Sequence, residues 1–268
     1  KTARHFDHTV STIKQLDVLN DTDGFDVVIN LAGQGIADKR WTQTIKKQIR
    51  DSRIITTQKL ITYLQTAEKK PELLISGSAI GYYGNQGEKP VDEHMSGDSP
   101  GDRNFSSKLC LDWEHEAQQA EKLGIRVCYL RTGIVLGKNG GALSKMLPAF
   151  KLGLGGPMSN GRQWMSWIHI DDLIGIILHV INNKDINGAI NGTAPNPVTN
   201  KVFSSTLARV LKRPAFLSMP AFVLKLLLGE MAQELLLSGQ RVIPKKILDA
   251  GYDFQYTELE NALHEVVQ

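Results

Sequence analysis

The side chains best suited to chemistry follow one short apolar strand, Leu73–Ser76. Ser78 comes shortly after this strand, and the phenols of Tyr82 and Tyr83 follow it closely. A hydroxyl at such a strand end can hydrogen-bond the carbonyl or alcohol oxygen of a substrate and help polarise it. The same serine could instead satisfy backbone groups in its own turn. These residue types therefore favour a site that acts on an oxygen-bearing substrate.

Lys108 is a further candidate, and the residue four positions before it is Asn104. Neither this amide nor the phenylalanine that follows it can titrate, so neither can serve as a general acid. We hypothesise that Tyr82, Tyr83 or Asp102 supplies the acid instead. The alternative for Lys108 is a solvated lysine on a helix surface.

A second strand exit lies at Asn30–Gly33, where an apolar run closes with small residues. Nucleotides bind at the carboxyl edge of parallel sheets, and small residues let a ligand approach the backbone closely. Arg53 belongs to the helical segment that follows and lies near its buried face, where a guanidinium needs a partner. A phosphate, a substrate carboxylate or an aspartate would each serve.

The elements that must position these groups alternate between buried apolar runs and helical patterns. We expect strands at 25–33, 73–76 and 126–130, and helices at 41–64, 105–123, 142–152, 171–181 and 199–211. This alternation indicates right-handed βαβ units and a Rossmann-type, doubly wound parallel sheet in an α/β protein. The strand and Gly-rich turn that usually open such a sheet are absent, so we expect roughly 30 further residues before Lys1 in the native protein.

Local signals mark where the later helices begin and end. Asp171 or Asp172, and further along Thr199, can cap the start of a helix. Pro244 is expected to end a helix, because its ring cannot continue one. Gly251 is expected at a helix C-cap, where its missing side chain permits the left-handed conformation.

Composition limits the class of protein. The chain has 268 residues, 41% of them hydrophobic, and a formal net charge of +3. This suits one α/β unit with a small appended part and argues against a nucleic-acid surface. The two cysteines lack the spacing of a disulfide framework or a metal site, so no metal is expected. The longest apolar run, 221–228, is too short to cross a bilayer, and no signal peptide opens the chain, so we predict a soluble cytoplasmic protein.

Several segments resemble the extended short-chain dehydrogenase/reductase family, also called the NAD(P)-dependent epimerase/dehydratase family. They are Ser78 with Tyr83-Gly84, Arg131–Gly137 and Trp167–Leu173. In that family the serine polarises the reacting oxygen, and a Tyr-x-x-x-Lys pair exchanges the proton and binds the nicotinamide ribose. The resemblance implies catalytic roles for Ser78 and Lys108, with Asn104 where the tyrosine is expected.

The resemblance also implies a dinucleotide cofactor. Its expected contacts lie at strand ends, at the chain start and in the helix with the lysine: Leu31, Ala32, Gly33, Ser76, Gly77, Lys108, Arg131, Thr132, Gly133, Lys1 and Arg4. Basic residues at Lys1 and Arg4 favour the 2′-phosphate of NADP, with NAD as the alternative. Substrate contacts are expected from Tyr82, Tyr83, Arg53, Gln163, Trp167 and His169. A structural role is the alternative for the histidine, and a core position for the tryptophan.

The C-terminal segment 239–254 is similar to the small domain of one subgroup, usually described as "epimerase family protein". We expect a dinucleotide-binding part at 1–152 and 171–194, and a small, mostly helical substrate-side part at 153–170 and 195–268. The predicted function is an NADP-dependent oxidoreductase or epimerase-like enzyme acting on a small polar substrate. The alternative is a non-catalytic NADP-binding sensor or scaffold. The resemblance allows a homodimer, and neither a nucleic acid nor a membrane is expected as a partner.

Overall fold

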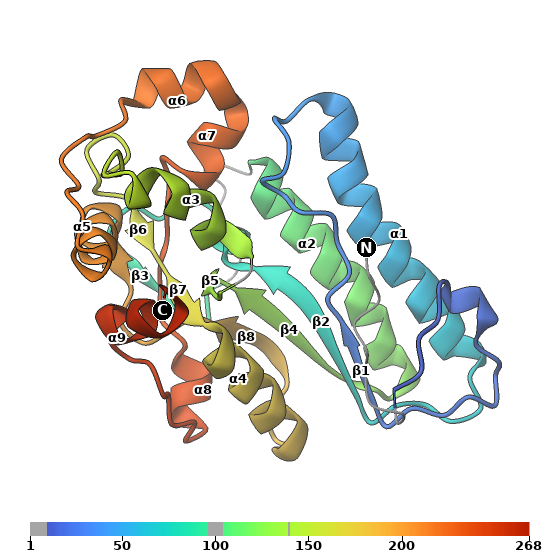
Figure 1. Ribbon diagram of the computed structural model, residues 1–268. Helices are drawn as coiled ribbons and strands as arrows, with labels where there is room; N and C mark the ends of the chain where they lie inside the picture. The colour runs from blue at the N-terminus through green and yellow to red at the C-terminus, as the bar shows by residue number, and fades with distance from the viewer. Residues whose placement is uncertain (1–9, 96–103, 139, 268) are drawn as a thin grey trace.

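Four parallel strands form the central sheet within the residues that the computed structural model describes, 10–95, 104–138 and 140–267. In order across the sheet they are β1 (Val27–Asn30), β2 (Leu73–Ala79), β4 (Arg126–Thr132) and β8 (Gly188–Gly192) (Figure 1). The register pairs Asn30 with Ser76 and Ser78 with Arg131. Because the strands are parallel, their carboxyl ends meet at one edge of the sheet.

Helices cover both faces of this sheet. The longer helices of the structure as a whole are α1 (Gln43–Thr66), α2 (Phe105–Gln118), α3 (Gly141–Lys151), α4 (Ile170–Asn182) and α5 (Asn200–Leu211). The shorter ones are α6 (Ala221–Leu228), α7 (Glu230–Leu235), α8 (Lys245–Asp249), α9 (Leu259–Val267) and the 3-10 helices η1 (Leu16–Val18), η2 (Ile80–Tyr83) and η3 (Gln119–Leu123). One core packs α1 and α2 against Leu74 and Val127, and another packs α4 and α8 against Leu73 and Leu130. The predicted doubly wound α/β sheet is thereby confirmed.

Three pairs of short strands lie outside the central sheet. They are β3 (Pro90–Val91) with β10 (Arg241–Val242), β5 (Ile134–Leu136) with β7 (Trp167–His169), and β6 (Trp164–Met165) with β9 (Val198–Thr199). A third core joins α3, α5 and α9 around Trp167. Within the described residues, no helix is long and apolar enough to cross a membrane.

Several element ends differ from the sequence-based expectations. β2 runs on through Gly77 and Ser78, and the expected helix 105–123 changes to 3-10 geometry at η3. The first turn of α4 is capped by His169, whose Nδ1 accepts from a backbone N–H, rather than by an aspartate. Pro244 precedes α8, so the prediction that it ends a helix was wrong; its fixed φ suits a helix start. The caps at Thr199 and Gly251 are confirmed.

Candidate functional site

A buried ionic network lies under the carboxyl ends of β2 and β4. Arg131 donates from Nε and Nη2 to the two carboxylate oxygens of Glu114 on α2, each at 2.9 Å. Ser78 donates to the same carboxylate at 2.6 Å. The side chains of Arg131 and Glu114 are only 4% and 10% exposed. Burial acts to lower the pKa of Arg131, but hydrogen bonding and attraction to Glu114 raise it overall. The hydroxyl of Ser78, the predicted catalytic serine, is therefore engaged as a hydrogen-bond donor to a buried carboxylate.

The two tyrosines of η2 differ in their hydrogen bonds. Tyr83 donates from its hydroxyl to Asn191 at 2.7 Å and accepts from Arg131 at 3.1 Å. Burial raises the pKa of Tyr83 to about 12. Tyr82 is half-buried, and its ring centroid lies 3.4 Å from the guanidinium carbon of Arg131, a cation–π contact. Its hydroxyl makes no hydrogen bond with the described residues. Of the two phenols, Tyr82 is therefore the one whose hydroxyl no described residue engages.

The face of α2 that meets the end of β2 carries Ser106 and Cys110, one turn apart. A Cβ at Gly81 would lie 3.3 Å from the Ser106 Cβ and 3.9 Å from the Cys110 Sγ. Burial raises the pKa of the Cys110 thiol to about 11. Lys108 is exposed, and the side chain of Asn104 caps the helix. Residues two apart on a helix point in different directions, so Asn104 and Lys108 do not share the face of Ser106 and Cys110.

A carboxylate from the C-terminal part lies at the start of α2. Glu234 on α7 accepts from the backbone N–H groups of Phe105 at 3.1 Å and Ser106 at 2.9 Å. It also accepts from the hydroxyl of Ser106 at 2.6 Å. Free N–H groups in the first turn of a helix favour a negative charge there. This contact holds α7 against α2, so the C-terminal part borders the carboxyl edge of the sheet.

The exit of β1 is open, and Arg53 lies beside it. Leu31, Ala32 and Gly33 are exposed, and a Cβ at Gly33 would lie 2.9 Å from the Arg53 Cζ. Arg53 donates from Nη1 to two backbone carbonyls at 3.0 and 3.1 Å and lies over the Trp113 ring at 5.2 Å. Burial lowers the pKa of Arg53, and no carboxylate among the described residues pairs with it. A half-buried guanidinium whose Nε and Nη2 donate to none of the described residues suits an anionic ligand.

Tight packing accounts for other predicted cofactor contacts. A Cβ at Gly77 would lie 2.7 Å from a tryptophan ring of α2, and one at Gly133 would lie 2.3 Å from a backbone carbonyl oxygen. Thr132 is half-buried, and its hydroxyl donates to a backbone carbonyl at 3.4 Å. Ser76 is fully buried, and its hydroxyl has no partner among the described residues. Both glycines are therefore needed for packing, whatever the edge of the sheet binds.

Gln163 precedes β6, and Trp167 opens β7. Gln163 donates from Nε2 to the carbonyls of Met158 at 3.2 Å and Leu236 at 2.7 Å. Trp167 is fully buried in the core of α3, α5 and α9 and donates to a backbone carbonyl at 3.1 Å. None of these hydrogen bonds reaches the network around Glu114. The structure does not join these two side chains to that network.

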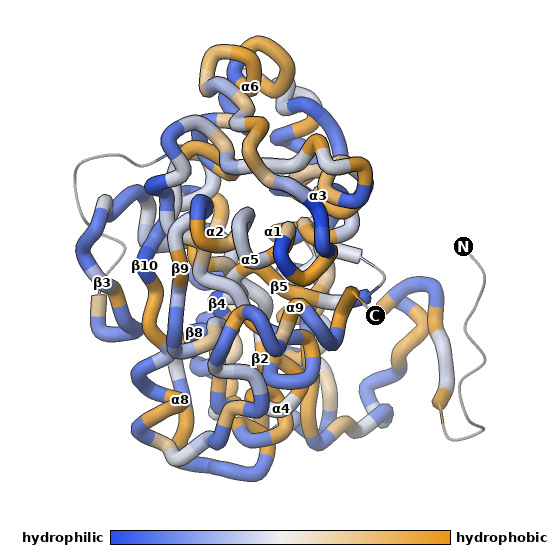
Figure 2. Tube along the Cα trace, turned by 60° about the vertical axis from the view of Figure 1, so that its left-hand side comes forward, coloured by the Kyte–Doolittle hydropathy of each residue, from blue (hydrophilic) through white to orange (hydrophobic). Residues whose placement is uncertain are grey.

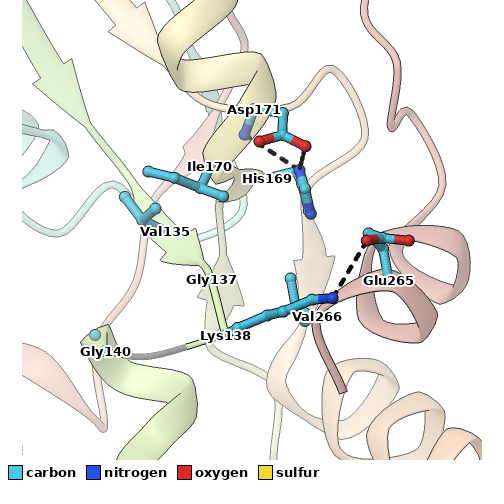
Figure 3. A pocket seen from close by; sticks show the side chains of 10 residues that line it. Val135, Gly137, Lys138, Gly140, His169, Ile170, Asp171, Glu265 and Val266 are labelled. Atoms are coloured by element: carbon cyan, nitrogen blue, oxygen red, sulfur yellow. Dashed lines mark hydrogen bonds and ion pairs between the residues drawn. The ribbon is translucent and has the colours of Figure 1, made fainter. Parts of the chain in front are cut away.

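His169 lines a separate cavity of about 530 Å³, together with Lys138, Asp171 and Glu265 (Figure 3). Its Nδ1 accepts from the backbone N–H of Asp171 at 3.2 Å, and its ring lies 3.9 Å from the ring of Tyr256. Burial lowers the pKa of His169, more than the neighbouring carboxylates raise it. His169 thus shapes the start of α4 and the wall of this cavity.

Three predicted residues, Lys1, Arg4 and Asp102, lie outside the described residues. Sequence reasoning also missed the partners that engage Ser78 and Tyr83, namely Glu114 and Asn191. A signal for Glu114 was present, because this charged residue follows Cys110 by four positions on the apolar face of a helix. Asn191 had no such signal, since only the parallel pairing of β4 and β8 brings it to the site.

The chain belongs to the NAD dependent epimerase/dehydratase family, whose model matches residues 3–191. Residues 219–266 match a second model, a domain of unknown function called DUF1731. The parallel sheet with helices on both faces agrees with this membership. The expected division into two parts, with boundaries at 152–153, 170–171 and 194–195, stays a prediction.

Several relatives share most of the chain. It is 42% identical over 251 residues to the Arabidopsis thaliana "Epimerase family protein SDR39U1 homolog, chloroplastic", covering 93% of this chain and 70% of the relative. It is 43% identical over 242 residues to the Bacillus subtilis "Epimerase family protein YfhF", covering 90% and 78%. The crystal structure of human epimerase family protein SDR39U1 with NADPH has a TM-score of 0.85 at 36% identity, covering 91% and 82%. The Bacillus cereus UDP-glucuronic acid 4-epimerase, at 18% identity and a TM-score of 0.69, shares the fold alone.

Proposed function

We propose that this chain binds NADPH along the carboxyl edge of the sheet and uses it in a reductive or epimerase-like reaction. Arg53 carries the proposal, because it is a half-buried cation without a described carboxylate partner, beside the exposed exit of β1. Such a group fits a phosphate or another anionic part of the cofactor. The human relative that was crystallised with NADPH supports the same ligand class, with NAD as the alternative.

Each residue at the sheet edge would have a separate role in binding the cofactor or moving a proton. Arg53 would hold an anionic group of the cofactor, and the backbone of Leu31–Gly33 would lie against it. Lys108 is exposed on α2, off the face that Ser106 and Cys110 turn toward η2, so this proposal gives it no contact with the cofactor. When bound, NADPH would supply a hydride to a carbonyl carbon of a small polar substrate. Tyr82 would donate the proton to the carbonyl oxygen, since the hydroxyls of Ser78 and Tyr83 are engaged in the buried network.

The test is NADPH turnover by the full-length protein with a panel of aldehydes, ketones and nucleotide sugars. With a substrate found, Tyr82→Phe should lower kcat by about 10²- to 10⁴-fold, the usual contribution of a positioned proton donor. NADPH affinity should stay unchanged in this variant. Tyr83→Phe is the matched control on the neighbouring phenol, and it should reduce stability more than kcat. Full activity of Tyr82→Phe would remove Tyr82 from the proposal.

A second function, binding NADPH without catalysis, is favoured by the α2 face. Ser106 and Cys110 occupy the positions one turn apart that face η2, and neither offers a phenol or an ammonium group. A protein of this kind would report cofactor status to a partner. NADPH binding together with a silent substrate panel would favour this second function over the first.

A further inference from the structure

Exposed apolar side chains gather around α6. Phe222 and Leu226 lie one turn apart on this helix and are 72% and 74% exposed, and Leu227 is 59% exposed. Phe216, in the segment before the helix, is 76% exposed. Figure 2 shows α6 as a mainly hydrophobic segment that projects at the top of the molecule. Large side chains of this kind rarely stand together on a surface without a binding role.

The segment after α3 extends this surface. Residues 152–158 run beside residues 214–219, because Met158 and Met219 form a β-bridge and the N–H of Met219 donates to the carbonyl of Pro157 at 3.1 Å. Leu152 and Leu154 on this segment are 74% and 59% exposed. Together the apolar residues form one surface, here called the α6 face: Leu152, Leu154, Phe216, Phe222, Leu226 and Leu227.

The charges interleaved with the α6 face between residues 151 and 225 have one sign, and the acidic residue that follows α6, Glu230, is paired with Lys46. Lys151, Lys212, Arg213 and Lys225 are interleaved with its apolar residues and exposed, and none forms an ion pair with the described residues. The sequence contains no Asp or Glu at 139–170 or at 186–229, although these segments hold eight Lys and Arg residues. Lys145 and Arg209 pair with Asp38 and Glu260, and the other six form no ion pair with the described residues, in a chain whose net charge is only +3.

We propose that the α6 face docks on an anionic lipid surface. Its phenylalanines and leucines would enter the boundary between headgroups and acyl chains, while the bordering cations contact lipid phosphates. A second copy of the chain is a poorer partner, because a symmetric contact would bring two surfaces of the same positive charge together. The binding is peripheral, since α6 has 8 residues and cannot span a bilayer.

Co-sedimentation of the full-length protein with vesicles tests the proposal. The probe is phosphatidylcholine vesicles containing phosphatidylglycerol, compared with vesicles of phosphatidylcholine alone. We expect binding to the anionic vesicles only, weakened by high salt. Phe222→Ser with Leu226→Ser should weaken binding by about tenfold or more through lost apolar insertion. Lys225→Gln should weaken it by about fivefold, the share of one basic residue near such a surface.

Matched controls separate this surface from general effects. Leu178→Ser changes a leucine that is 53% exposed on α4, at the opposite end of the molecule from α6 in Figure 1. Lys122→Gln removes an exposed cation from η3. Both controls should bind anionic vesicles like the unmodified protein, and all variants should keep its far-ultraviolet circular dichroism. Equal binding to neutral vesicles, no vesicle binding, unaltered binding by the α6 variants, or retention on immobilised polyglutamate without vesicle binding would each overturn the proposal.

Discussion

Removing the charge of Glu114 tests whether the network under the sheet edge is a structural support. Glu114→Gln would leave Arg131, whose side chain is 4% exposed, without its counter-charge. It would also weaken the acceptor for two guanidinium hydrogen bonds and for Ser78. Breaking a buried ion pair by removing one partner costs about 3–5 kcal/mol. We expect the free energy of unfolding, measured by urea denaturation, to fall by about this amount.

An exposed ion pair that joins α2 to α1 provides the control. Asp112 accepts from Arg50 at 3.0 Å, and both side chains are 47% exposed. Asp112→Asn should therefore change the free energy of unfolding by less than about 1 kcal/mol. Replacing both buried charges together, with Glu114→Leu and Arg131→Met, should recover most of the loss, because no unpaired charge remains. A Glu114→Gln protein within about 1 kcal/mol of the unmodified one would refute the structural assignment.

Other predictions concern packing and titration at single positions. Gly133→Ala should lower the free energy of unfolding by about 1–3 kcal/mol in urea melts, because its Cβ would lie 2.3 Å from a carbonyl oxygen. In the control Gly137→Ala, the nearest atom to the new Cβ is 3.7 Å away, so the loss should be much smaller. Burial holds the pKa of His169 below its ordinary 6.5. The neutral imidazole therefore contributes its full stability above that pH, and this contribution is lost as the pH falls. Urea melts between about pH 5 and 7 should show a free energy of unfolding that changes less with pH in His169→Asn than in the unmodified protein. Burial raises the thiol pKa of Cys110 and of Cys128 to about 11, so iodoacetamide at about pH 8 should label them only after unfolding, and rapid labelling of the native protein would contradict their burial.

Three of the four strands of the sheet were predictable from sequence as apolar runs. β2 and β4 are buried along most of their length, and the run before Asn30 also predicted β1, although Ile29 is 44% exposed. The fourth strand, β8, was not expected, because Gly188–Gly192 is not an apolar run. Helix caps were less predictable. Two aspartates at the start of α4 are of a residue type that often caps helices, yet the N-cap is His169, whose imidazole accepts from a backbone N–H. Single-residue signals of this kind depend on tertiary packing that the local sequence does not contain.

The sequence predicted which strand ends meet at the edge of the sheet better than it predicted the contacts of the side chains there. Strand ends marked the edge of the sheet, and the structure places the exit of β1, Ser78 and Gly133 along it. Hydrogen-bond partners were not readable from the sequence, because Glu114 and Asn191 reach Ser78 and Tyr83 only through long-range packing. The motif spacing also placed Lys108 on α2, but it did not predict that the Lys108 side chain is exposed to solvent.

The most direct measurement of cofactor binding at the sheet edge is an NADPH fluorescence titration of Arg53→Gln. The matched control is Arg50→Gln, which removes an exposed arginine from the same helix. We expect Arg53→Gln to bind NADPH about ten- to hundredfold more weakly, the loss of one or two charge-assisted hydrogen bonds, while Arg50→Gln binds like the unmodified protein. Equal NADPH affinity in the two variants would contradict a cofactor site beside the exit of β1.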